Sequence, residues 1–373
     1  MTDATPRRIR IGIDTGGTFT DVVAFDEDTG ALVSTKTPST PSDPADGFLA
    51  GVRKVLGLLD ATGDDITAVC HGTTVATNQL LEGSVGELGF ITTEGYEFIL
   101  EIARQAVPDG YGNSYFWVKP PRIVPADRVR TVAGRMDFEG KEVRPFDEAE
   151  AVEVARWFRE RGIDTIGVCF LHSYAEDHHE RRMQEVLRRE HPDAVVSLSS
   201  EVLREYREYE RFSTTALNAF VGPKTSRYIE NLAGKAKAAQ VGEDVHLMTS
   251  AGGLVTSRSA SEVPVSLLTS GVVAGLLGGC FIGKASGYPS VITLDVGGTS
   301  ADIGVAPDGK LRMKHLLDTR IGDYHAMVPM AEVDTIGAGG GSIASIDEGG
   351  MFRVGPRSAG AMPGPACYNR GGT

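Results

Sequence analysis

The sequence predicts an α/β protein made of two similar lobes, with a smaller α/β unit inserted in the first. Three observations lead to this fold class. A segment of eleven residues near the N-terminus recurs 281 positions later, apolar strand patterns alternate with amphipathic helix patterns, and a compact helix–strand–helix–strand run separates the two copies. We assign residues 1–104 to the first lobe with the first hairpin. Residues 105–200 form the inserted subdomain, and 201–373 the remainder of the first lobe and the start of the second lobe, with the second hairpin.

The first lobe is expected to begin with three strands and a helix. Residues 9–25 alternate apolar and polar side chains around a Gly-Gly turn, which predicts a β-hairpin, and residues 31–36 can add a third strand. In residues 43–59, Asp43 and Pro44 suit the start of a helix and an apolar stripe follows at helical spacing. A strand, a Gly-rich turn and a helix over residues 66–82 complete a βββαβα order with a parallel component.

Beyond residue 82, the sequence pattern changes from regular to proline-rich and then back to regular helix and strand patterns. A further strand is expected over residues 87–91, and the proline-rich residues 105–145 predict an irregular or β-rich connection. Residues 147–198 predict helix, strand, helix and strand in turn, and helices resume over 201–240. A strand over residues 245–249, a helix over 270–286 and a second hairpin over 291–305 follow.

Composition excludes several classes of partner and location. The 373 residues carry a net charge of −13, and their 37 basic residues are scattered, which disfavours nucleic acid or an anionic membrane and favours small molecules. No apolar run is long enough to span a bilayer, and the N-terminus lacks the apolar core of a signal peptide. The four cysteines have no paired spacing, which fits free thiols in a reducing cytoplasm.

The two copies of the repeated segment share their polar residues. Residues 11–21 read IGIDTGGTFTD and residues 292–302 read ITLDVGGTSAD, so both contain Asp-x-Gly-Gly-Thr-x-x-Asp. Each copy is an apolar strand ending in a carboxylate, a Gly-Gly turn, a threonine and a second strand that opens with Asp. The wide spacing implies two similar lobes, because a solenoid repeat would be far shorter.

These residue types suit a clamp around phosphate. Glycines without Cβ let backbone N–H groups approach phosphate oxygens closely, and the threonines can donate hydroxyl hydrogen bonds. Two such clamps facing each other across a cleft would hold one nucleotide from both sides. The alternative is that each motif is only a tight hairpin turn. The predicted nucleotide-binding residues of the hairpins are Thr15, Gly16, Gly17, Thr18, Thr20, Asp21, Gly297, Gly298, Thr299 and Asp302.

The strand-end carboxylates Asp14 and Asp295 predict a divalent-cation site. A carboxylate beside a polyphosphate repels it unless a cation lies between them. We therefore interpret both residues as ligands to Mg²⁺ or to its waters.

Two further motifs are candidates for the same site. His71-Gly-Thr-Thr74 follows an apolar strand, where Thr73 and Thr74 can hold a phosphate or a carbonyl with His71 as acid or base, or serve as an ordinary helix N-cap. The glycines Gly337, Gly339, Gly340 and Gly341 permit close backbone approach to a ligand, with a surface turn as the alternative. His178 and His179 are flanked by charged residues, which predicts a solvated helix face and no metal site.

The paired hairpins resemble the two phosphate loops of the actin, Hsp70 and sugar-kinase superfamily, with its ribonuclease H-like lobes. The first hairpin is also similar to the opening of hydantoinase A, 5-oxoprolinase and acetone carboxylase subunits. Further matching motifs occur in order along the chain at residues 71–78, 101–105, 218–223, 248–253, 334–344 and 363–368. Two departures are Ser270-Gly-Val-Val-Ala-Gly275, where a Ser-Gly-Pro-Ala-Gly run is usual, and the end at Thr373, where family members continue. The resemblance therefore implies a truncated second lobe.

The resemblance also implies an activity. It indicates ATP- and Mg²⁺-dependent ring opening of a cyclic amide, such as a hydantoin, 5-oxoproline or another lactam, through a phosphorylated carbonyl, with Asp14, Asp295 and His71 as catalytic residues. The chain would act as one subunit of a hetero-oligomer beside a partner of the hydantoinase B type. The alternatives are a subunit of an ATP-dependent ketone carboxylase and a non-catalytic nucleotide-binding assembly subunit.

Overall fold

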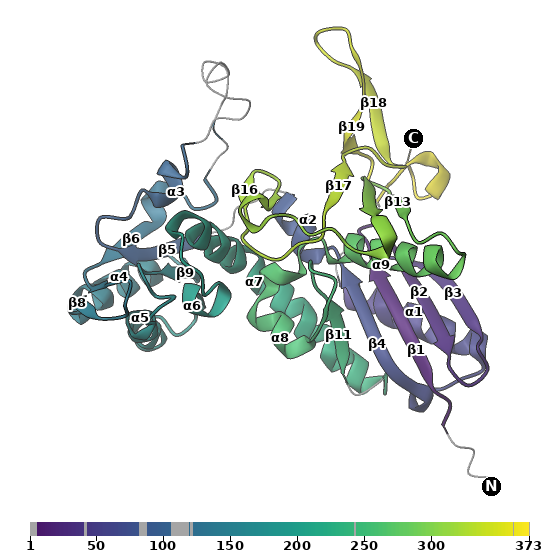
Figure 1. The fold of residues 1–373 in the computed structure, drawn as a ribbon, viewed down its shortest axis with the longest axis horizontal. Coiled ribbons are helices and arrows are strands. Elements are labelled where there is room, and N and C mark those ends of the chain that lie inside the picture. Colours follow the sequence, from purple (N-terminus) through teal and green to yellow (C-terminus); the bar gives the residue numbers. More distant parts are fainter. Residues whose placement is uncertain are drawn as a thin grey trace.

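The computed structural model describes residues 6–40, 43–81, 88–105, 119, 122–241, 244–360 and 362–372. Figure 1 shows two bodies joined by a long central helix, with a β-hairpin projecting from the C-terminal part. The helices are α1 (Pro44–Leu59), α2 (Val75–Leu81), α3 (Ile99–Ile102), α4 (Glu148–Glu160), α5 (His178–Glu190), α6 (Ser199–Val202), α7 (Glu208–Ala238), α8 (Ser257–Glu262) and α9 (Ser270–Ala285).

A six-stranded sheet forms the first body, in the order β12-β11-β4-β1-β2-β3. Its strands are β1 (Ile9–Thr15), β2 (Phe19–Asp26), β3 (Leu32–Pro38), β4 (Ile66–Thr73), β11 (Val245–Met248) and β12 (Leu254–Thr256). Strand β1 is antiparallel to β2 and parallel to β4, which confirms the expected βββαβα order with a parallel component. The apolar side chains Ile9, Ile11 and Ile13 alternate toward a core that α1 and α7 cover.

Helix α1 begins and packs as the sequence of residues 43–59 predicts. The Asp43 carboxylate accepts a hydrogen bond from the Ala45 N–H, and Pro44 occupies the first turn, where its missing N–H costs nothing. The buried stripe of Phe48, Val52 and Val55 then packs on the sheet.

A four-stranded sheet forms the second body, in the order β10-β9-β5-β6. Its strands are β5 (Leu88–Thr93), β6 (Val129–Val132), β9 (Thr165–Cys169) and β10 (Val195–Leu198), and the short strands β7 (Arg135–Met136) and β8 (Glu142–Arg144) pair beside it. Strand β5 precedes residue 105, so this sheet also uses chain from before the inserted region. The part of residues 105–145 that the structure describes is β-rich.

Helix α7 connects the two bodies. Its N-terminal half packs Phe212, Leu217 and Phe220 into one core with β5, whereas Tyr228 and Leu232 pack into the core beneath β1. Pro223 lies between these halves, where it removes one helical hydrogen bond. One helix thus belongs to two hydrophobic cores.

The second hairpin lies beyond α9. Strands β13 (Val291–Val296), β14 (Ala301–Ala306) and β17 (Val333–Ile336) form an antiparallel sheet. The other C-terminal pairs are β15 (Arg320–Ile321) with β16 (Tyr324–His325) and the projecting β18 (Ser342–Ile346) with β19 (Phe352–Ser358). Gly279 and Gly283 let β13 approach α9, since a Cβ at either would lie 2.2 Å from a β13 side chain. None of the helices in the described ranges is both long and apolar enough to cross a membrane.

Candidate functional site

The two Asp-x-Gly-Gly-Thr hairpins have the same local structure. Asp14 pairs with Asp21 across the first hairpin, and Asp295 pairs with Asp302 across the second. Each turn is closed by the first glycine, since the Gly16 N–H donates to the Phe19 carbonyl at 3.0 Å and the Gly297 N–H to the Ser300 carbonyl at 2.9 Å. The sequence repeat is therefore a structural repeat.

The tips of the hairpins touch each other. A Cβ on Gly298 would lie 2.8 Å from Thr18 Oγ1, closer than carbon and oxygen normally approach. Beside this contact, the rings of Phe19 and Tyr368 meet edge to face with centroids 5.5 Å apart. Two segments from opposite ends of the chain thus meet at one place.

Asp14 lies at this junction on the sheet face opposite the isoleucine core. Its Oδ1 atom is buried and has no hydrogen-bond partner, and a Cβ on Gly271, in the first turn of α9, would lie 2.9 Å from that oxygen. Burial and then the negative charge of Asp295 raise the pKa of Asp14 to about 6. A buried, unpaired carboxylate oxygen is costly without a ligand.

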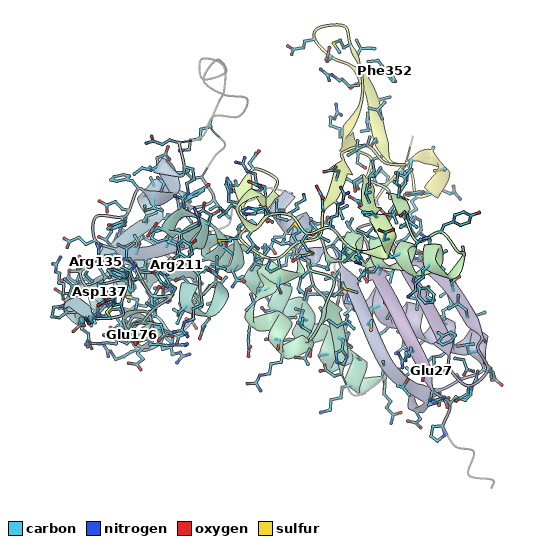
Figure 2. All side chains as sticks on the ribbon, viewed as in Figure 1. Glu27, Arg135, Asp137, Glu176, Arg211 and Phe352 are labelled. Atoms are coloured by element: carbon cyan, nitrogen blue, oxygen red, sulfur yellow. The ribbon has the colours of Figure 1, made fainter. Side chains whose placement is uncertain are left out.

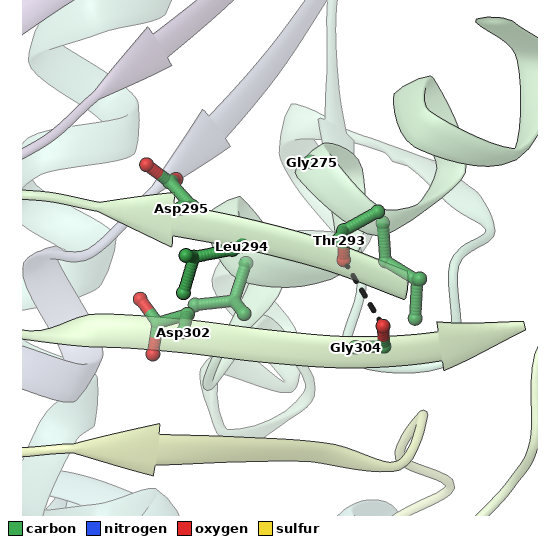
Figure 3. Close-up of a pocket in the computed structure, with 8 residues that line it drawn as sticks. Gly275, Thr293, Leu294, Asp295, Asp302 and Gly304 are labelled. Carbon is green, nitrogen blue, oxygen red and sulfur yellow. Dashed lines mark hydrogen bonds between the residues drawn. The ribbon is translucent and has the colours of Figure 1, made fainter. Parts of the chain in front are cut away.

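Asp295 and Asp302 line a pocket of about 380 Å³ between the second hairpin and α9. Figure 3 shows both carboxylates at the same end of the paired strands. Burial raises the pKa of Asp302, although Thr335 donates a hydrogen bond to its Oδ1 at 2.5 Å. Helix α9 therefore contacts both halves of the site: its first turn faces Asp14, and Val272, Gly275 and Leu276 face the second pocket.

The donor set fits a hard divalent cation. Four carboxylates gather where the hairpins meet, and each of the other three raises the pKa of Asp14 through its charge. One lysine offsets part of this charge: Lys36 Nζ lies 2.9 Å from Asp21 Oδ2, and its charge also acts to lower the pKa of Asp14. Oxygen ligands with excess negative charge are the set that Mg²⁺ prefers.

His71 lies on the other face of the sheet. In the β1–β4 register it pairs with Ile13, and so it points into the core with 1% of its surface exposed. Its Nδ1 lies 3.3 Å from the Ile13 carbonyl, which can only accept, and its Nε2 lies 2.6 Å from the Tyr228 hydroxyl, which then donates. Burial lowers the pKa of His71 to about 4. The buried ring thus links β4 to β1 and α7, and acid–base catalysis by His71 stays a prediction without geometric support.

The threonines differ in their exposure. Thr299 is exposed at the second tip, whereas Thr18, whose hydroxyl lies at the tip contact, is buried with 8% of its surface exposed. Thr15, Thr20 and Thr73 are buried, and the Thr20 hydroxyl bonds to Ser39 at 3.0 Å.

The Thr73–Thr74 turn acts as the start of α2. The Thr74 hydroxyl accepts from the Asn78 side chain at 3.1 Å, and the Thr73 hydroxyl accepts from the Val75 N–H at 3.3 Å. The Thr74 hydroxyl also donates to the Thr15 carbonyl at 3.3 Å, so only the Thr73 hydroxyl accepts from a backbone N–H at the start of α2.

The glycine run supports the second hairpin. The Gly340 and Gly341 N–H groups donate to the Gly297 and Gly298 carbonyls at 2.9 and 2.7 Å. The Gly339 N–H donates to Ser342 Oγ, and the Gly337 carbonyl would contact a Cβ on Gly355. Because three of these N–H groups are already paired, the run shapes the hairpin tip and leaves little to bind phosphate directly.

Sequence reasoning missed several neighbours of the site. Tyr368 and Asn78 lie within quoted motifs without an assigned role, yet they approach Gly298 and Gly17 respectively. Tyr228, whose hydroxyl bonds to His71 Nε2, lies outside every motif identified in the sequence. The departure at Ser270–Gly275 forms the first turns of α9, and the Ser270 hydroxyl donates to the Thr73 carbonyl at 3.0 Å.

Comparison with known proteins agrees with this arrangement. The hydantoinase/oxoprolinase N-terminal region family matches residues 10–191, and the hydantoinase/oxoprolinase family matches residues 211–373. The caprolactamase subunit alpha of Pseudomonas jessenii is 36% identical over 98% of this chain and 53% of its own length.

Two solved structures share the fold. The nucleotide-free acetone carboxylase, from work on the mechanism of ATP-dependent acetone carboxylation, matches with a TM-score of 0.86 and 25% identity over 95% of this chain and 52% of that one. The ATP-dependent caprolactamase of Pseudomonas jessenii matches with a TM-score of 0.78 and 36% identity over 97% and 53%. The chain spans about half the length of these relatives. It belongs to the hydantoinase/oxoprolinase family, whose relatives are ATP-dependent enzymes.

Proposed function

We propose that this chain binds Mg·ATP between its two hairpins and uses it to open a cyclic amide, as one subunit of a larger enzyme. The observation that carries the proposal is the contact between Thr18 and Gly298, which brings two matching turns and four carboxylates to one point. The two-lobed actin-like fold belongs to the same proposal.

The chemistry explains why ATP is needed. An unstrained amide is a poor electrophile, and phosphorylation of its carbonyl oxygen supplies both a leaving group and a more electrophilic carbon. Water then adds to that carbon, the C–N bond breaks, and a second water releases phosphate from the acyl phosphate. The products are the amino acid, ADP and phosphate.

The residues of the chain have defined tasks in this scheme. Asp14 and Asp295 would hold Mg²⁺, which neutralises charge on the transferring phosphoryl group when bound. The open N–H groups of the hairpin turns and the hydroxyls of Thr18 and Thr299 would orient phosphate oxygens. The buried Oδ1 of Asp14, which lacks a partner, supports this assignment. A partner of the hydantoinase B type would complete the reaction after phosphorylation.

Ketone carboxylation is the second candidate. The TM-score of 0.86 with acetone carboxylase favours it, and an enol phosphate of a ketone would arise from the same phosphoryl transfer. The higher identity to caprolactamase, 36% against 25%, favours the amide.

The test uses the enzyme that contains this chain, together with its partner subunit. ADP release is measured with a panel of lactams and hydantoins, and in parallel with ketones plus bicarbonate, together with identification of the products. We expect lactam-dependent ADP release coupled to a ring-opened amino acid. Stimulation by ketone and bicarbonate alone would replace the proposal with the second candidate, and ATP binding without turnover in either panel would indicate a non-catalytic assembly subunit.

A further inference from the structure

A cluster of two histidines and a glutamate lies in the second body, on the far side of the molecule from the hairpins (Figure 1). His178 and His179 open helix α5, and Glu142 lies on strand β8. One ligand atom from each residue lies within 4.8 Å of the other two. The sequence predicted a solvated helix face here, which is wrong for His179, because only 3% of that side chain is exposed.

We propose that Glu142, His178 and His179 bind a divalent transition-metal ion of the Zn²⁺ type, which links β8 to the start of α5. His179 Nε2 lies 2.7 Å and His178 Nε2 lies 3.3 Å from the same oxygen, Glu142 Oε1. Ligands placed at the usual Zn–N and Zn–O distances around a tetrahedral ion are about 3.4 Å apart. The His178 separation already fits, and an ion would replace the His179 hydrogen bond with a shift of well under an ångström.

The buried histidine is held in place before any ion arrives. Its ring packs against Phe146 with centroids 5.5 Å apart, and a Cβ on Gly134 would lie 3.3 Å from its Nδ1 and Cε1. Gly134 has a φ of +144°, which an L side chain rarely adopts, so the backbone here leaves room for the imidazole. A ligand fixed by packing loses little entropy when it binds a metal.

The remaining ligands face solvent, which gives an ion an entry path. The side chains of His178 and Glu142 are 41% and 38% exposed, so a fourth position stays open to water. Figure 2 labels Glu176, whose carboxylate lies 3.9 Å from His178 Nδ1 and can orient that ring.

The charges around the cluster select among cations. Burial is the main factor that disfavours positive charge on His179, and the charge of Arg182 adds to it, whereas Glu142 opposes both. Mg²⁺ and Ca²⁺ bind through charge to oxygen ligands, so one carboxylate against this background holds them poorly. Zn²⁺, Ni²⁺ and Co²⁺ form strong bonds to imidazole nitrogen, which the two histidines supply.

The test titrates the purified 373-residue chain with Zn²⁺ by calorimetry and with Co²⁺ by visible absorption, after dialysis against a chelator. We expect one equivalent of Zn²⁺ to bind at this cluster and a Co²⁺ spectrum with nitrogen coordination. Any heat with Mg²⁺ should come from the hairpin carboxylates and stay unchanged in His178→Gln and Glu142→Gln. His178→Gln and Glu142→Gln should each weaken Zn²⁺ binding at least tenfold. The matched control is His315→Gln, which removes a histidine that is 70% exposed and outside the cluster.

Folding of the variants is checked separately by melting curves in chelator. His178→Gln and Glu142→Gln change surface side chains and should melt close to the unmodified chain. Zn²⁺ binding that is absent, or that persists unchanged in the His178→Gln/Glu142→Gln double variant, would overturn the site. Equal weakening by His315→Gln would show that the affinity comes from exposed histidines in general, and this also overturns it.

Discussion

The two hairpins share a motif, a turn hydrogen bond and a register of aspartates, yet they differ in their surroundings. In the first hairpin, Ile11 faces a core beneath α1 and α7 and is 1% exposed. In the second, the equivalent residue Ile292 is 75% exposed, because β13 turns its other face toward α9. The motif therefore fixes the tip, and the neighbouring elements decide which face of the strand is buried.

The same contrast applies to the aspartates. Asp14 lies behind α9 with a buried oxygen, whereas Asp295 is exposed at the edge of its pocket. The two aspartates that correspond in the repeat therefore have unequal roles. In the proposed Mg²⁺ site, Asp14 is already held in place by its neighbours, and Asp295 supplies the second carboxylate when the ion binds.

The largest effect is expected from the paired strand residues. Ile11→Ala removes buried methyl groups from a packed core and should cost about 2–5 kcal/mol of unfolding free energy. Ile292→Ala should cost less than about 0.5 kcal/mol, because surface changes have little effect. Denaturant melts of the 373-residue chain measure both, and equal losses would mean that the second hairpin is as well packed as the first.

The ionisation of Asp14 gives the next effect. Its folded pKa of about 6 exceeds the unfolded value of 3.8, so the unfolded chain loses its proton first as pH rises. Asp14 therefore disfavours the folded state increasingly between pH 4 and pH 6, by at most about 3 kcal/mol, and by a constant amount above pH 6.

The Asp14→Asn variant isolates this contribution. In chelator, the difference in stability between the variant and the unmodified chain should grow in favour of the variant from pH 4 to pH 6. A difference that does not change with pH would show that Asp14 is solvated like an ordinary surface carboxylate.

A smaller effect tests the contact between the tips. Gly298→Ala places a Cβ 2.8 Å from Thr18 Oγ1 and should lower stability by about 1–2 kcal/mol. Gly17→Ala is the matched change in the first hairpin, where the nearest atom is Asn78 Nδ2 at 3.5 Å, an ordinary contact. Melting temperatures compare the two, and a larger loss for Gly17→Ala would contradict the way the tips meet.

Much of the fold could be predicted from local patterns. Asp43 and Pro44 marked the start of α1, and the repeated motif located both hairpins. The alternation of side chains along a strand also predicts where His71 points. Val69 faces the core, and His71 lies two residues later in the same strand, so its side chain faces the core as well. That argument needed the β1–β4 register, which the sequence alone did not supply.

Other features depended on long-range contacts that no local pattern encodes. The glycine run 337–341 pairs with the tip of the second hairpin, some 40 residues earlier, and a Gly-rich turn looks the same whether its N–H groups bind phosphate or a carbonyl. Tyr228 reaches His71 from the middle of α7, and Glu142 reaches His179 from a two-stranded hairpin. Such partners become visible only when the chain is folded.

The central claim is that Asp14 and Asp295 act on one shared ion. A double-mutant cycle of ATPase rates, in the enzyme that contains this chain together with its partner subunit, measures this directly. Asp14→Asn and Asp295→Asn keep side-chain size, and each should reduce turnover by about 10² to 10³ without unfolding the protein. In chelator at neutral pH, Asp295→Asn should melt close to the unmodified protein and Asp14→Asn somewhat higher, because its buried charge is gone.

Because either change alone removes the shared ion, the double variant should be nearly as active as the slower single variant, within about tenfold. A double variant slowed by the product of the two single effects would mean that the aspartates act independently. Unchanged turnover in both single variants would show that the hairpins hold no ion needed for turnover. It would also rule out a nucleotide site shared by the two hairpins.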